Sequence, residues 1–160
     1  MTTRIEVREI APQRLLVKKA TCAHKDIGPA FGAAIHSVRQ CLSASAAKMA
    51  SPPMAVYLAW RDSDCDLAAG CEVEGEVALS QGCEWLDLPG GPHAFASHFG
   101  PYAMLGETHG AIRSWCNANE LKIANACWEA YPVDPGSEPD SSKWQTDVYY
   151  PVAAEQVQVA

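Results

Sequence analysis

Residues 34–38 read AIHSV, and residues 111–115 read AIRSW. Residues 56–60 likewise match residues 127–131, and Cys65-Asp66-Leu67 matches Thr146-Asp147-Val148. The repeating unit is too long for a solenoid, whose repeats run to roughly 20–50 residues. The matches therefore predict two copies of one supersecondary unit, packed about a pseudo-twofold axis.

Each copy reads as two strands, one helix and two further strands. In the first copy, apolar residues follow the helical period at 31, 34, 35, 38, 41 and 42, after Gly28-Pro29. Gly100-Pro101 opens the second helix. The expected strands are 5–10, 15–17, 54–60, 65–73, 83–88, 93–99, 126–131 and 146–152. The predicted fold is α+β: a tandem β-β-α-β-β repeat in one domain, 1–160, with half-repeats at about 1–75 and 76–155. A ligand cleft is expected between its antiparallel sheets.

Composition and charge narrow the function classes. The 160 residues are 48% hydrophobic and carry a net charge of −7, with a pI near 5.1. A core can form, and unaided nucleic-acid binding is disfavoured because it needs a basic surface. Charged residues interrupt the N-terminal segment, and no apolar run approaches the length of a membrane span. We expect a cytoplasmic protein whose charged ligands are cations, with no nucleic acid or membrane as a direct partner.

The cysteines and acidic residues do not predict a metal site. Seven cysteines occur without a CxxC pair, which favours buried thiols over disulfides or zinc. His93 and His98 fall on opposite faces of a strand. The acidic turn at Asp62, Asp64 and Asp66 lacks the glycine and distal glutamate of a calcium loop. We expect neither a metal nor another cofactor.

The second half of the chain carries motifs of a known family. Glu129-Ala130-Tyr131 precedes the last loop, residues 146–152 read TDVYYPV, and Gly100-Pro101-Tyr102 stands before the second helix. In these motifs the chain resembles the GyrI-like small-molecule-binding domain, which is also the effector-binding part of some AraC-type and MerR-type transcription regulators. The resemblance covers essentially the whole chain. It implies an SHS2-type duplication and an aromatic pocket with one acidic residue, here Glu129, suited to lipophilic cations.

Strand parity refines the implied site. Glu129 and Tyr131 share one face, which we assign to the cleft, and Trp128 and Ala130 share the other, assigned to the helix side. The candidate ligand-binding residues are Glu129, Tyr131, Tyr149, Tyr102, Trp60 and Tyr57. Trp60 is the counterpart of Tyr131, whereas Tyr57 aligns with Trp128 and so has the opposite parity. For the aromatic residues the alternative is packing. For Glu129 it is an exposed position, and in a pocket its carboxyl group is either protonated or held ionised by hydrogen bonds.

Three functions fit these residues. The first is a stand-alone module that senses or sequesters amphipathic, cationic or aromatic small molecules. The second is hydrolysis of cyclopropane-containing or other reactive xenobiotics, as the resemblance implies. Glu129 would then be the general base, and Tyr102 or Tyr149 would donate to the oxyanion. The third is a protein interaction of the gyrase-inhibitor type, which no clustered charge in the sequence favours.

Overall fold

The computed structural model describes residues 3–124 and 126–153, and the chain divides into two compact units. One unit is Pro12–Pro89. The other joins Met1–Ala11 to Gly90–Ala160. Each unit contains four antiparallel strands and one long helix, as the repeat predicts. The α+β class and the β-β-α-β-β order of elements are therefore confirmed.

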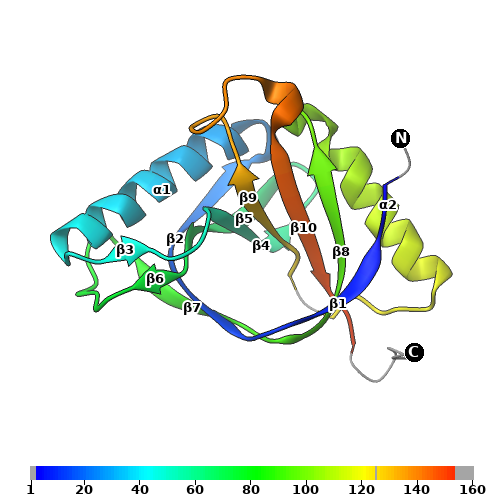
Figure 1. Cartoon of the computed structure of the whole chain (residues 1–160), viewed down its shortest axis with the longest axis horizontal. Coiled ribbons are helices and arrows are strands. Elements are labelled where there is room, and N and C mark those ends of the chain that lie inside the picture. The colour runs from blue at the N-terminus through cyan, green and yellow to red at the C-terminus, as the bar shows by residue number, and fades with distance from the viewer. Residues whose placement is uncertain (1–2, 125, 154–160) are drawn as a thin grey trace. The chain divides into compact units, whose positions relative to one another are not determined.

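The unit that contains the C-terminal half has the strand order β1-β8-β10-β9 (Figure 1). These strands are β1 (Glu6–Ile10), β8 (Gly91–Phe99), β10 (Gln145–Pro151) and β9 (Trp128–Val133). Helix α2 (Leu105–Ala118) follows the short helix η2 (Tyr102–Met104), and η3 (Ser141–Lys143) precedes β10. Helix α2 packs on β8 and β10, and Ile112 and Cys116 of the helix join Ala94, Ala96 and Val148 in one core.

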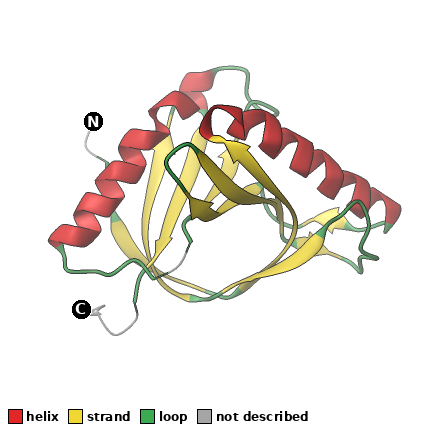
Figure 2. Ribbon diagram, turned by 180° about the vertical axis from the view of Figure 1, so that it is seen from behind, coloured by secondary structure: helices red, strands yellow, loops and turns green. Residues whose placement is uncertain are grey.

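The unit Pro12–Pro89 has the corresponding order β7-β2-β5-β4. Its strands are β7 (Glu84–Leu88), β2 (Gln13–Ala23), β5 (Asp64–Cys71) and β4 (Met54–Trp60). Helix α1 (Ile27–Ala44) follows η1 (His24–Asp26) and packs on β2 and β5. Figure 2 shows the two long helices in red beside the yellow strands. The strands β3 (Lys48–Met49) and β6 (Val73–Glu74) form a separate small sheet. The predicted helical stripe is buried at Ala34, Ile35, Val38, Cys41 and Leu42.

The two sequence repeats exchange their first strands. Strand β1 pairs with β8 of the second repeat, and β7 pairs with β2 of the first. The two-residue links Ala11-Pro12 and Pro89-Gly90 disfavour a return hairpin. Such a hairpin needs positive φ at its first central residue, which alanine avoids and proline cannot adopt. None of these four residues has positive φ. The sequence halves 1–75 and 76–155 therefore do not coincide with the compact units.

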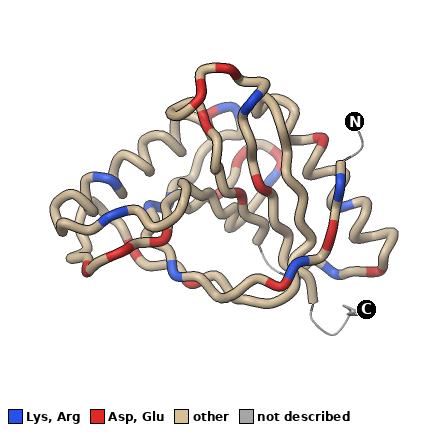
Figure 3. Tube along the Cα trace, in the orientation of Figure 1, with Lys and Arg blue, Asp and Glu red and all other residues tan. Residues whose placement is uncertain are grey.

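Acidic and basic residues occur in both units. In Figure 3 acidic and basic residues are interspersed along the trace of both units. All seven cysteines lie in the described ranges as free thiols. Among residues 3–124 and 126–153, no three His, Cys, Asp or Glu side chains gather as a metal site would require. Within the same ranges, no helix combines the length and apolar character that crossing a bilayer demands.

Candidate functional site

Glu129 lies on the face of its sheet that carries α2. It is the cross-strand partner of Val148, and cross-strand partners project from the same face of a sheet. Val148 belongs to the core that includes Ile112 of α2. The expectation that Trp128 faces the helix is therefore wrong, and the two faces of β9 are interchanged. Strand parity shows which residues share a face, but it does not show which face the helix covers.

Both oxygens of the Glu129 carboxylate are hydrogen-bonded. Nε2 of His109 lies 2.5 Å from Oε2, and the Tyr131 hydroxyl donates to Oε1 over 2.6 Å. The Glu129 side chain is only 3% exposed. A buried carboxylate needs such partners because desolvation disfavours its charge. The His109 and Tyr131 contacts supply these partners from within the protein.

His109 connects Glu129 to a longer polar chain on α2. Its Nδ1 lies 2.6 Å from the Tyr150 hydroxyl, and Arg113, one turn further along the helix, donates to the same oxygen over 3.1 Å. Burial by itself lowers the pKa of His109, but contacts with Cys127 and Glu129 outweigh it and raise this pKa to about 9. The imidazole is thus an imidazolium at neutral pH, and the Glu129 charge is balanced from within the protein.

Sequence reasoning missed His109, Tyr150 and Arg113. Their signal was weak: His109 and Arg113 stand four residues apart on one helix, and Tyr150 alternates with Tyr149 in the closing strand. Neither pattern points to Glu129, which is 20 residues beyond His109 and on a strand.

Removing the Tyr131 hydroxyl tests this hydrogen-bond chain. Tyr131→Phe keeps the ring and deletes one donor to a buried carboxylate, and such a bond contributes about 1.5–3 kcal/mol. We expect urea titration at pH 7 to give a free energy of unfolding lower by about 2 kcal/mol. The control is Tyr149→Phe, whose hydroxyl makes no hydrogen bond within the part of the chain that the structure describes, and it should leave stability nearly unchanged. Equal effects of the two substitutions would contradict the assignment.

Aromatic rings continue from Tyr131 toward the surface. The Tyr102 ring, from η2, packs edge-on against Tyr131 with centroids 5.9 Å apart, and Trp144 lies 5.0 Å from Tyr102. Burial, with Asp134 and Glu129 nearby, raises the pKa of Tyr102 to about 12, so its hydroxyl stays protonated at neutral pH. The Trp144 indole is fixed by a 2.7 Å hydrogen bond to the Glu138 carbonyl. The structure thus brings predicted Tyr102 together with Tyr131 and adds Trp144, which the sequence left unassigned.

Tyr149 does not join this group. It pairs across the strands with Trp128, and their rings stack at 3.9 Å with an interplanar angle of 7°. Phe95 of β8 lies on the same face, 4.9 Å from Tyr149. Tyr149 was expected as a neighbour of Glu129, but it projects from the opposite face of the sheet. Because side chains alternate along a strand, Tyr150 takes the place expected for Tyr149.

Trp60 and Tyr57 belong to the unit Pro12–Pro89. Register on β5 shifts between Tyr57 and Ala59, so Leu58 forms an irregularity in β4. Tyr57 pairs with Leu67 and Trp60 with Cys65, both on the α1 side, and the two rings meet at 5.6 Å. In the sequence repeat Tyr57 aligns with Trp128, which has the wrong parity for the proposed site. The irregularity resolves this conflict, because in strand register Tyr57 pairs with Leu67 as Glu129 pairs with Val148.

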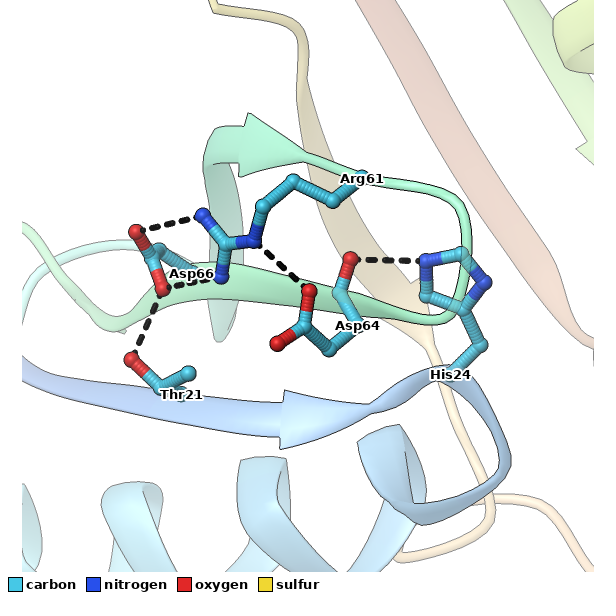
Figure 4. Close-up of polar contacts among 5 residues, drawn as sticks. All are labelled: Thr21, His24, Arg61, Asp64 and Asp66. Carbon is cyan, nitrogen blue, oxygen red and sulfur yellow. Dashed lines mark hydrogen bonds and ion pairs between the residues drawn. The ribbon is translucent and has the colours of Figure 1, made fainter.

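Trp60 is the last residue of β4, and polar contacts stabilise the turn that follows it. Its ring is 61% exposed and stacks on His24 at 4.0 Å. His24 contacts the Asp64 carbonyl, while Arg61 bonds Asp64 and Asp66, and Thr21 donates to Asp66 (Figure 4). The Arg61 and Thr21 contacts lower the pKa of Asp66 to about 2. The Asp64 and Asp66 carboxylates of this turn thus pair with one arginine.

One family model matches residues 3–153, and it is the GyrI-like small-molecule-binding domain. The chain belongs to this family. No sequence among the curated proteins matches it. The GyrI-like assignment agrees with the duplicated fold and identifies the chain as a small-molecule-binding domain.

Solved structures share the fold of this GyrI-like domain at low sequence identity. The EcmrR C-terminal domain is 16% identical with a TM-score of 0.80, over 96% of this chain and 99% of that one. SAV2435 bound to tetraphenylphosphonium is 10% identical with a TM-score of 0.68, over 96% of each chain. A hydrolase from Listeria innocua is 13% identical with a TM-score of 0.65, over 94% of this chain and 92% of that one. At such identities the likeness establishes the fold alone.

Proposed function

We propose that this domain binds lipophilic aromatic cations, with Glu129 as the anionic group of the site. The observation that carries the proposal is a buried carboxylate beside a run of aromatic rings, namely Tyr131, Tyr102 and Trp144. A cation next to these rings gains both charge pairing and cation–π contacts, each of about 0.5–2 kcal/mol. Few directional contacts mean broad specificity.

The comparisons support this ligand class by analogy. SAV2435, which shares the fold, is described with the organic cation tetraphenylphosphonium bound. EcmrR carries the same fold as its C-terminal domain. We propose a site without Tyr149, because its ring lies on the opposite face of the sheet from Glu129. The contribution of Trp60 and Tyr57 stays a prediction.

The test compares a cation with a neutral compound of similar bulk. Methyltriphenylphosphonium and triphenylphosphine oxide are titrated into wild type and Glu129→Gln, and binding is followed by tryptophan fluorescence. The titration is run at pH 9, where His109 is half deprotonated and leaves part of the Glu129 charge uncompensated. We expect the substitution to weaken cation binding at least about tenfold and to change binding of the neutral compound less than about twofold.

Two results would contradict the proposal. Equal losses for both compounds would mean that Glu129 is not the charge partner of the cation. Absence of cation binding to wild type at pH 9 would exclude lipophilic cations as the ligand class. Circular dichroism of Glu129→Gln serves as the control that the fold is intact.

Hydrolysis of reactive xenobiotics is a second candidate, favoured by the hydrogen-bonded set His109–Glu129–Tyr131. In such a reaction Glu129 would take a proton from water, and the protonated Tyr102 hydroxyl would donate to a developing oxyanion. A solved structure of the same fold is described as a hydrolase. Mass spectrometry of a cyclopropane-containing electrophile after incubation distinguishes the two functions: a hydrated product lost in Glu129→Gln supports turnover, and recovery of intact compound supports binding alone.

A further inference from the structure

Glu129 already has a cation within the protein. His109 Nε2 lies 2.5 Å from the carboxylate, and the His109 side chain is 16% exposed. A ligand cation therefore meets a carboxylate that is paired, and it gains little from Glu129 while the imidazolium remains. Cation binding at Glu129 therefore depends on whether His109 keeps its proton.

The surroundings of His109 fit both of its protonation states. In the imidazolium, Nε2–H donates to Glu129 and Nδ1–H donates to the Tyr150 hydroxyl, which also accepts from Arg113. In the neutral ring, the Tyr150 hydroxyl donates to Nδ1 instead, while Nε2–H still donates to Glu129. Tyrosine can turn its proton either way, so His109 can lose one proton without breaking a hydrogen bond or changing rotamer.

We propose that His109 is a specificity-determining residue of this site, because its proton and the ligand cation compete for the charge of Glu129. The inference rests on the proposed function and adds the regulation of the same site. Binding of a permanent cation releases one proton from His109 to solvent, and the Glu129 carboxylate exchanges one positive partner for another. A neutral aromatic ligand does not compete for the charge of Glu129, so it binds while His109 keeps its proton.

The expected size of the effect follows from the balance of protonation states. With the His109 pKa at about 9, roughly one molecule in a hundred carries neutral His109 at pH 7. Affinity for a permanent cation is then reduced roughly 100-fold at pH 7 and recovers about tenfold per pH unit as pH 9 is approached. At acidic pH the site therefore favours neutral aromatic ligands, and at alkaline pH it favours cations.

Other titratable groups face His109 and must be separated from it. They are Glu129 and Tyr131 from β9, Tyr150 from β10, Cys127 from the segment before β9, and Arg113 from α2. Burial, followed by the charge of Cys127, raises the pKa of Tyr150, so this hydroxyl releases no proton in the range of the experiment. Cys127→Ser removes the thiol as a source of protons and leaves His109 in place.

The test is calorimetric titration of tetraphenylphosphonium into wild type, His109→Gln and Cys127→Ser between pH 6.5 and 9. Tetraphenylphosphonium keeps its charge at every pH, and buffers of different ionisation enthalpy report the protons released. Glutamine supplies a donor for Glu129 and an acceptor for Tyr150 but takes up no proton. We expect about one proton released at pH 7 by wild type and none by His109→Gln. Cys127→Ser should still release protons, though fewer than wild type, because loss of the thiol contact lowers the pKa of His109 while the Glu129 contact remains. The affinity of His109→Gln should be nearly independent of pH and up to about 100-fold tighter than wild type at pH 7.

The possible outcomes separate the inference from the proposed function. Binding by wild type with constant affinity and no proton release overturns the inference and leaves cation binding standing. Proton release that is lost in Cys127→Ser and kept in His109→Gln assigns it to the thiol and also overturns the inference. Absence of binding by all three proteins at every pH overturns the proposed function and the inference together.

Discussion

Raising the pH from 6.5 to 9.5 should lower the free energy of unfolding of the wild-type protein by up to about 3 kcal/mol through His109 alone. The folded-state pKa of His109, about 9, lies above its ordinary value of 6.5. The folded protein therefore holds this proton more tightly than the unfolded chain does. The resulting stabilisation is complete below pH 6.5 and is lost as the pH rises through 9.

Urea titrations of wild type, His109→Gln and Glu129→Gln across this range measure the effect. His109→Gln should not show the loss of stability assigned to His109. In Glu129→Gln the histidine and its contact with Cys127 remain, but the pKa of His109 falls without the carboxylate, so the loss of stability should be smaller than in wild type. A pH profile of His109→Gln that parallels the wild-type profile would contradict the assignment. The same profiles report on the Glu129–His109 pair without any ligand.

Gly70→Ala should destabilise the protein by about 3 kcal/mol or more, or prevent folding. Gly70 lies within β5, and a Cβ atom built on it would stand 1.7 Å from the Leu16 carbonyl oxygen and 2.8 Å from the Val17 Cα of β2. These are backbone atoms of a paired strand, so no side-chain rotation relieves the clash. Either β2 shifts and weakens its pairing with β5, or the sheet does not close.

Gly32→Ala is the matched control for this substitution. Gly32 lies in α1, and a Cβ atom there would meet nothing within 4 Å. Alanine in a helix interior is favoured over glycine by roughly 0.5–1 kcal/mol, so this variant should be slightly more stable than wild type. Chemical denaturation followed by circular dichroism compares the two. A Gly70→Ala protein within 1 kcal/mol of wild type would show that the strands tolerate a side chain at this point.

The role of Gly70 illustrates a limit of sequence patterns. In the sequence this glycine weakens the strand prediction for residues 65–73, because glycine is disfavoured in strand interiors. In the structure it permits the close approach of β2 to β5. A strand pattern reports the preferences of one segment, whereas the need for glycine arises from the neighbouring backbone.

For the candidate site, too, the sequence predicts local features and misses the packing between elements. Parity within β9 correctly placed Glu129 and Tyr131 on one face, because side-chain alternation is a property of the strand itself. It did not reveal that α2 covers this face, so Trp128 was wrongly assigned to the helix side, and Tyr149 was wrongly expected on the same face as Glu129. Tyr149 and Tyr150 are equally plausible from the sequence, and only the pairing of β10 with β9 distinguishes them.

The sequence by itself determined the duplicated order of elements and the buried stripe of α1, and its family motif pointed to Glu129 as the acidic residue of the proposed site. Each of these rests on local periodicity or on a motif within a few residues. Only the tertiary structure decided the exchange of β1 and β7 and the partner of Glu129. Both depend on atoms that are distant in the chain. The links at 11–12 and 89–90 disfavour a hairpin but do not identify the strand that pairs instead. His109 meets Glu129 only because α2 packs on β10, next to β9.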